Sequence, residues 1–225
     1  MTTIQVVSFD LDGTITDASF ADSVWLEGIP RVYALEKHIS LEDAKREVKS
    51  EYNKVGRGKL EWYSLDYWIK KFGLNISPNE VLKSYQYSIK IFPEVHRVLE
   101  NLRSKGFRLI IISNAQREFV DLELEETHIT HYFDRIFSST SDFRLIKDAA
   151  SLYSRVCRIC DITPQEMAHV GDDRYFDFEV PKRLGILAFY LDRTGQCREE
   201  SAIHNLLKLN EKIRKQAGTR VELHQ

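Results

Sequence analysis

The sequence predicts an α/β fold, in which a doubly wound, Rossmann-like parallel sheet forms a core and an all-helical domain is inserted after the first strand. Short apolar runs alternate with helical patterns along most of the chain, which is typical of a parallel sheet covered by helices. Between about residues 18 and 91 no convincing strand pattern occurs. We therefore predict a core domain of residues 1–17 and 91–225, and a helical domain of residues 18–90.

The predicted strands are short and apolar. The first runs from Ile4 to Phe9, which is almost uncharged and rich in β-branched residues, as in a strand covered on both faces. The other expected strands are Arg108–Asn114, the weaker run Arg135–Ser138, Met167–Gly171 and Gly185–Leu191. The helices expected between and after them span about Arg117–Thr127, Asp148–Cys160 and Arg198–Lys215.

The inserted region has two clear helix starts. Ser40 and Ser77 are each followed three residues later by an acid, which is the arrangement of an N-cap. Apolar residues recur at helical spacing in LEDAKREVKSEYNKV, KLEWYSLDYWIKKFG and EVLKSYQYSI. The large aromatic side chains of this region are expected in the core of the helical bundle: Trp25, Trp62, Tyr63 and Trp68.

Composition limits the partners that the protein can have. Apolar residues make up 43% and charged residues 29% of the 225 residues, as in ordinary globular proteins. The formal net charge of −2 gives no argument for nucleic acid or an anionic membrane as partner. Three cysteines do not suggest a disulfide scaffold, and no stretch reaches the length of a membrane span. A cytoplasmic protein, either a monomer or a homodimer, is therefore the expectation.

Polar side chains follow the predicted strands at their carboxyl ends, where open α/β sheets bind ligands. Asp10 and Asp12 follow the first strand, and alone they would suggest a simple turn or a helix cap. The second strand ends in Ser113 and Asn114, and Lys147 follows the third. The fourth leads into GDDRYFD, which supplies three more acids: Asp172, Asp173 and Asp177.

This collection of side chains suits a magnesium ion together with a phosphate. Two carboxylates about 4 Å apart repel each other by roughly 4 kcal/mol at an effective dielectric constant near 20, and a divalent cation removes that penalty. Mg²⁺ prefers one or two carboxylates together with phosphate oxygens and water. Lys147 and the Ser113 hydroxyl are expected to hold the remaining phosphate oxygens, and backbone N–H groups near Asn114 to help them.

The order of these motifs resembles that of the haloacid dehalogenase superfamily, in its phosphatase branch. The resemblance rests on FDLDGT, a strand ending in SN, Lys147 and VGDDRYFD, and it covers Ile4 to about Asp192. It implies a Mg²⁺-dependent phosphoric monoester hydrolase that acts on a small phosphorylated metabolite through an aspartyl-phosphate intermediate. The helical insertion resembles the type 1 cap domain of this family.

The resemblance also implies a role for each matched residue. Asp10 would be the nucleophile, and Asp12 the general acid that protonates the leaving group and later activates water. Mg²⁺ would be held by the Asp10 carboxylate, the Asp12 backbone carbonyl and Asp172. Asp177 would orient Lys147 or a water molecule bound to the metal. Dehalogenases of the family lack an aspartate at the position of Asp12, so that this residue favours phosphoryl transfer.

Several assignments stay open at this point. Arg144 is an alternative to Lys147, because the proline that often follows the family's lysine is absent here. Asp173 is an alternative to Asp172 as a metal ligand. In the cap, Arg57 lies in GRGKLEWY and either contacts substrate or belongs to a plain helix connection. A phosphomutase of the same superfamily is the alternative function, and a 2-haloacid dehalogenase or a non-catalytic binding protein is a weaker one.

Overall fold

A computed structural model of the protein describes residues 3–222, with side chains up to residue 215. Its centre is a six-stranded sheet in the order β3-β2-β1-β4-β5-β6, and each neighbouring pair of strands is parallel. The strands are β1 (Val6–Phe9), β2 (Arg108–Ser113), β3 (Arg135–Ser138), β4 (Met167–Gly171), β5 (Leu187–Leu191) and β6 (Ala202–Ile203). The predicted doubly wound α/β fold is confirmed.

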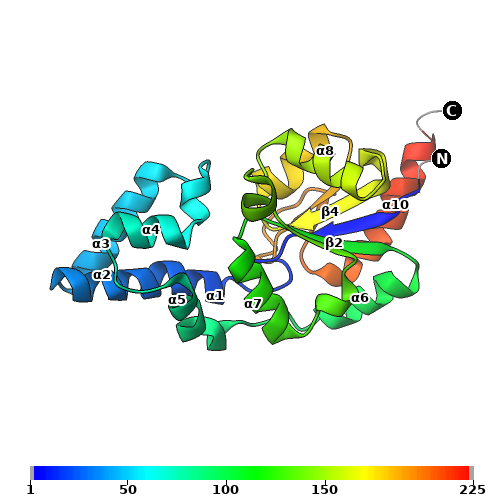
Figure 1. The fold of residues 1–225 in the computed structure, drawn as a ribbon. Coiled ribbons are helices and arrows are strands. Elements are labelled where there is room, and N and C mark those ends of the chain that lie inside the picture. Colours follow the sequence, from blue (N-terminus) through cyan, green and yellow to red (C-terminus); the bar gives the residue numbers. More distant parts are fainter. Residues whose placement is uncertain (1–2, 223–225) are drawn as a thin grey trace.

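Helices cover both faces of this sheet (Figure 1). One face packs against α6 (Val95–Ser104), α7 (Arg117–Thr127) and α10 (Leu209–Glu222). The other face packs against α8 (Ala150–Ile159) and α9 (Val180–Arg183). Because side chains alternate along a strand, Val7 and Phe9 of β1 point to the first layer and Val6 to the second.

The prediction for the C-terminal region was partly wrong. Residues 198–208 do not form the start of the last helix, because β6 and a 3₁₀ turn (Leu206–Lys208) precede α10. The free edge of β5 explains the difference, since its backbone groups need partners. Tyr190 and Leu191 pair with β6, and the N–H of Asp192 donates to the carbonyl of Ile203 over 2.9 Å.

The inserted region is helical and has a core of its own, as Figure 1 shows for the helices α2–α5 beyond the sheet. Its elements are α1 (Ser19–Asp22), a π-helical segment (Ser23–Gly28), α2 (Ile29–Lys37), α3 (Leu41–Val55), a 3₁₀ turn (Leu60–Tyr63), α4 (Leu65–Phe72), α5 (Pro78–Tyr85) and a second 3₁₀ turn (Gln86–Ser88). Ser40 and Ser77 cap α3 and α5 as predicted. Phe119 of α7 packs in the same aromatic cluster, so the cap rests on a core helix. The domain boundaries stay a prediction.

The chain crosses between core and cap twice, and the two crossings lie side by side. Thr16 forms an antiparallel bridge with Ile91. The N–H of Asp17 donates to the carbonyl of Lys90 over 2.9 Å, and the N–H of Phe92 donates to the carbonyl of Ile15 over 3.1 Å. The cap is therefore joined to the core by two short, hydrogen-bonded segments.

The strand order reverses between β1 and β4, which creates a crevice beyond their carboxyl ends. The segments that follow β1 and β4 both open into this crevice, and the cap lies over it. Within the described part of the chain, no helix is both long and apolar enough to span a lipid bilayer.

Candidate active site

The loop after β1 places two carboxylates at the crevice. Asp10 is held by its N–H, which donates to the carbonyl of Val170 on β4 over 2.9 Å, and only 7% of the residue is exposed. Gly13 has a φ of +73°, and a β-carbon there would lie 2.3 Å from an Asp172 carboxylate oxygen. Glycine is thus required, both for the backbone angle and for the close approach of Asp172. Asp12 lines the same cavity as Asp10.

Lys147 lies at the centre of the charged network. Its Nζ donates to Asp10 Oδ1 over 2.6 Å and to Asp177 Oδ1 over 2.7 Å, and the residue is 2% exposed. Arg144, the alternative from the sequence, is exposed and does not line the cavity. These contacts favour Lys147 as the cation of the site.

Asp177 is the fully buried hydrogen-bond partner of this lysine. Its second oxygen accepts from the N–H of Asp173 over 3.0 Å, and His169 Nε2 lies 3.1 Å from the first. Gly171 makes room, because a β-carbon there would lie 2.3 Å from Cγ of Asp177. Burial alone would raise the pKa of Asp177, but Lys147 and His169 outweigh it and lower the pKa to about 2. Asp177 is therefore ionised near neutral pH and accepts a hydrogen bond from Lys147.

The end of β2 supplies a hydroxyl and an amide. Ser113 lines the cavity, and its Oγ accepts from the N–H of Ala115 over 3.0 Å. The Asn114 side chain accepts from the Lys147 N–H over 2.9 Å and from the Ser139 hydroxyl over 2.7 Å. Its Nδ2 donates to the Tyr63 hydroxyl over 3.3 Å. Asn114 therefore joins the lysine loop to the cap, while Ser113 keeps its hydroxyl at the cavity.

Asp172 and Asp173 have different surroundings. Asp172 lines the cavity beside Asp10, and it belongs to the cluster of carboxylates that could hold a metal. One oxygen of Asp173 accepts from the N–H groups of Tyr175 and Phe176 over 2.9 and 2.8 Å. Its other oxygen pairs with Arg57. The oxygens of Asp173 are thus engaged, which favours Asp172 as the ligand.

Three acids in the crevice have raised pKa values. Burial is the main cause for Asp10, whose pKa is raised despite the opposing charge of Lys147. Burial also raises the pKa of Asp12 to about 6. Asp172 faces solvent, but the protein atoms around it and the charge of Asp177 raise its pKa to about 6. The crevice is therefore short of positive charge for the number of carboxylates it contains.

The donor set fits a hard divalent cation. Asp10, Asp172 and Asp177 each offer an oxygen, and these oxygens lie within 4.8 Å of one another. Oxygen-only ligand sets of this kind suit Mg²⁺. A cation there would offset the repulsion among the carboxylates and favour their ionised forms. Because Asp177 is already hydrogen-bonded through both oxygens, Asp10 and Asp172 are the better carboxylate ligands.

The crevice and the cap enclose a cavity of about 430 Å³. Three of the four aromatic residues that we expected in the cap core line this cavity, namely Trp25, Trp62 and Tyr63. Only Trp68 is fully buried, at 0% exposure. Trp25 and Trp62 also pack against the cap core, so the prediction holds in part for them, whereas Tyr63 lies outside that cluster. Helical spacing does not distinguish a core position from the wall of a pocket.

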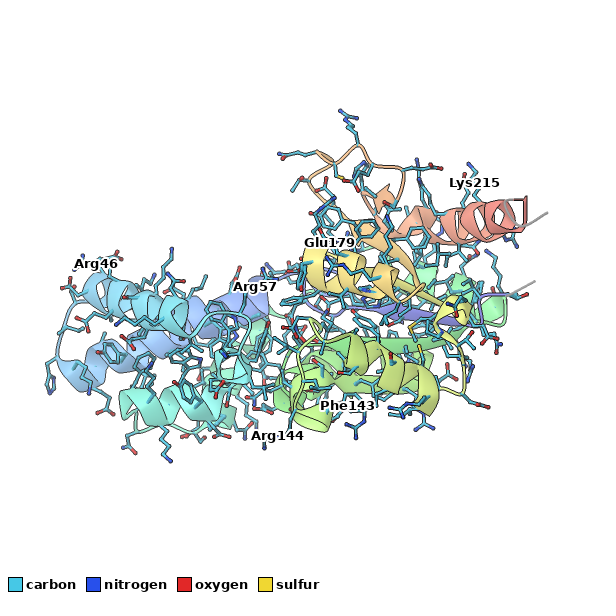
Figure 2. The ribbon with its side chains drawn as sticks, turned by 90° about the horizontal axis from the view of Figure 1, so that it is seen from above. Arg46, Arg57, Phe143, Arg144, Glu179 and Lys215 are labelled. Carbon is cyan, nitrogen blue, oxygen red and sulfur yellow. The ribbon has the colours of Figure 1, made fainter. Side chains whose placement is uncertain are left out.

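Arg57 reaches from the cap to the core (Figure 2). Its guanidinium pairs with Asp173 and lies 4.6 Å from the centre of the Phe176 ring. The Tyr63 hydroxyl donates to the Arg57 carbonyl over 3.0 Å. Arg57 lines the cavity and also ties the cap loop to the end of β4. Its contact with substrate stays a prediction.

Two residues near the site escaped the sequence interpretation. Glu123 of α7 is fully buried and accepts from the Thr16 hydroxyl over 2.5 Å, and it occupies a position on the apolar face of its helix. An acid among the apolar residues of a predicted helix was the sequence feature that could have indicated a buried carboxylate. Arg193 follows β5, another strand end, and donates to the carbonyls of Gly13 and Thr14 over 3.2 and 2.7 Å. It thereby holds the loop that contains Asp12.

A sequence profile of haloacid dehalogenase-like hydrolases matches residues 4–185, most of the chain. The chain belongs to this family. The match runs from β1 to the segment before β5, and so includes every strand end that supplies the crevice.

Related hydrolases of this family include named phosphatases. The chain is 28% identical to a phosphoglycolate phosphatase of Aquifex aeolicus over 81% of its length and 82% of the relative's. It is 24% identical to a GMP/IMP nucleotidase of Escherichia coli over 75% and 74% of the two chains. The structure superposes on a HAD phosphatase from Thermococcus onnurineus with a TM-score of 0.82 at 25% identity, covering 92% and 97% of the chains. The predicted family, its phosphatase branch and the class of phosphoric monoester hydrolases are confirmed.

Proposed function

We propose that the protein is a Mg²⁺-dependent phosphatase that hydrolyses a small phosphorylated metabolite through an aspartyl-phosphate on Asp10. The observation that carries the proposal is the contact of Asp10 with Lys147, in a cavity that Asp12, Ser113 and Asp172 also line. This cavity combines a nucleophile, a proton donor and partners for phosphate oxygens. The expectation of a cytoplasmic enzyme, monomeric or homodimeric, is part of the same proposal.

Magnesium would be held by the carboxylates of Asp10 and Asp172 and by the backbone carbonyl of Asp12. When bound, Mg²⁺ supplies positive charge that offsets the charge of the phosphoryl group and of the carboxylates. Lys147 and Ser113 bind the phosphoryl oxygens from the protein side, and Asp177 keeps Lys147 charged and oriented. Asp173 acts as support, through its bonds to the turn after β4 and to Arg57.

In the first half-reaction a carboxylate oxygen of Asp10 attacks phosphorus. The new bond joins Asp10 to the phosphoryl group, the bond from phosphorus to the ester oxygen breaks, and Asp12 gives its proton to that oxygen. A carboxyl with a pKa of about 6 keeps a useful protonated fraction near neutral pH, which suits this role.

In the second half-reaction water replaces the alcohol. Asp12, now ionised, accepts a proton from a water molecule as the water oxygen attacks phosphorus. The bond between phosphorus and Asp10 breaks, and free phosphate leaves with the Asp10 carboxylate restored. The two aspartates therefore end each cycle in the state in which they began.

Hydrolysis of p-nitrophenyl phosphate with Mg²⁺ tests this proposal. We expect turnover by the wild type and a loss of at least about 1,000-fold in Asp10→Asn, since the amide is a poor nucleophile. Asp121→Asn is a suitable control, because the Asp121 side chain is 62% exposed on α7 and does not line the cavity. Full activity of Asp10→Asn would refute the mechanism.

A further inference from the structure

The part of the cavity beyond the phosphoryl site is walled by aromatic rings that come from separate elements. Trp25 follows α1, and its ring stacks on Phe119 of α7 with a centroid distance of 5.5 Å and an interplanar angle of 13°. Trp62 and Tyr63 come from the turn between α3 and α4, and Phe176 follows β4. Aromatic walls of this kind favour a flat ring, which can stack against them.

The charges that line the cavity as a whole disfavour a second anionic group on the substrate. Among the described residues that line the cavity, the cations are Lys147 and Arg57. Lys147 pairs with Asp10 and Asp177, and Arg57 pairs with Asp173. Asp22 adds a further carboxylate to the wall. A carboxylate on the leaving group would therefore face anions, whereas hydroxyl or amino groups would find acceptors there.

The size of the cavity agrees with these two observations. Its volume of about 430 Å³ lies within the usual range for small-molecule pockets and is far more than one phosphoryl group needs. Alanines at positions 18, 21 and 115 line it, and their short side chains leave width between the aromatic rings.

We infer that the substrate is a phosphate ester of an uncharged alcohol that carries a planar ring, as in a nucleoside 5′-monophosphate. The inference rests on the proposed phosphatase function and adds the class of leaving group to it. The phosphoryl group binds at Asp10 and Lys147, the sugar crosses the mouth of the crevice, and the base lies among the partly exposed rings of Trp25, Trp62 and Tyr63. The carboxylate of Asp22 accepts hydrogen bonds from the nucleoside.

A matched series of substrates tests this assignment. With Mg²⁺ present, kcat/KM is measured for adenosine and guanosine 5′-monophosphates, for ribose 5-phosphate, which lacks the base, and for 2-phosphoglycolate, which carries a carboxylate. We expect the better nucleotide to exceed ribose 5-phosphate by about tenfold or more, because stacking of one base contributes about 1–3 kcal/mol. 2-Phosphoglycolate should be the poorest of the series. A higher kcat/KM for 2-phosphoglycolate, or for ribose 5-phosphate, would overturn the inference.

The same assays separate this inference from the proposed function. Turnover of p-nitrophenyl phosphate together with a preference for 2-phosphoglycolate would keep the phosphatase and refute the aromatic pocket. No turnover of any phosphate ester, p-nitrophenyl phosphate included, would refute both.

Substitution of Trp62 tests the pocket directly. Trp62→Leu keeps an apolar side chain, and the bond from Trp68 Nε1 to the position-62 carbonyl involves the backbone and is retained. We expect KM for the nucleotide to rise about tenfold with little change for ribose 5-phosphate. Tyr87→Leu is the control, since Tyr87 is 78% exposed and lies outside the cavity. An equal rise for both substrates would show a structural role and refute the contact with the base. Trp25→Leu provides a second, independent variant, for which the same result is expected.

Discussion

The two halves of the cavity are built in contrasting ways. The half at the end of the sheet is charged, and its central groups are buried. Lys147 is 2% and Asp177 0% exposed, and hydrogen bonds of 2.6 and 2.7 Å join Lys147 to Asp10 and Asp177. The half under the cap is formed by aromatic rings and by Arg57, whose side chain is 57% exposed. The first half thus consists of paired charges, whereas the second presents aromatic surface and one exposed cation.

This difference suggests that the two halves of the cavity recognise different parts of the substrate. A dense network of charges recognises the phosphoryl group, which all candidate substrates share. The aromatic half contacts the part of the substrate that differs among them. Substitutions in the first half should lower the rate for every substrate, and substitutions in the second should change the ranking of substrates. The following predictions test this contrast.

Asp12→Asn should have the largest effect of these variants. Loss of a general acid and base lowers rates by about 10²–10⁴-fold, and we expect that for all phosphate esters alike. Burial raises the pKa of Asp12 to about 6, and the acid acts in its protonated form. kcat/KM of the wild type should therefore fall as pH rises through about 6, and pH profiles should show that this descending limb is absent in the variant. A descending limb that is unchanged in Asp12→Asn would show that another group causes it.

Arg193→Met should have a smaller effect, still within the phosphoryl half. Arg193 donates to the Gly13 and Thr14 carbonyls and pairs with Glu94 over 2.8 Å. Without these bonds the loop that carries Asp12 loses its support, and we expect kcat to fall about 10- to 100-fold at nearly constant KM. Steady-state kinetics of Arg193→Met would check this, with Arg198→Met as the control because Arg198 is exposed. A rise in KM alone would contradict a positioning role.

Arg57→Ala should have the smallest effect on rate. Its pair with Asp173 is largely exposed, and such pairs contribute about 0–1 kcal/mol. We expect less than about a fivefold change in kcat/KM, with a change that differs between substrates. Arg46→Ala is the control, because Arg46 lies at the outer end of the cap, far from Arg57 (Figure 2). A loss above about 100-fold for all substrates would place Arg57 in the phosphoryl half instead.

The sequence was most informative where chemistry and topology coincide. The apolar runs predicted β1–β5, and parallel strands necessarily bring their carboxyl ends to one edge. Asp10, Ser113, Lys147 and Asp172 could therefore be placed together from the sequence, and the structure does bring them to one cavity. Their chemical roles stay proposals.

The features that the sequence did not predict depend on tertiary packing, which the spacing of apolar residues does not encode. β6 has two residues, too few to give a pattern, and its place follows from the free edge of β5. Trp62 and Trp68 both belong to the apolar pattern of KLEWYSLDYWIKKFG, yet Trp62 lines the cavity and Trp68 is fully buried. Glu123 and Arg193 are charged residues, and only the fold shows what they contact.

The central claim is that Asp10 becomes phosphorylated during turnover. The direct measurement is to quench the enzyme with acid during hydrolysis, reduce the acyl phosphate with borohydride and map the modified residue by mass spectrometry. The account predicts conversion of Asp10 to homoserine in the wild type, and none in Asp10→Asn. Turnover with an unmodified Asp10, or with the modification at Asp172 or another acid, would contradict it.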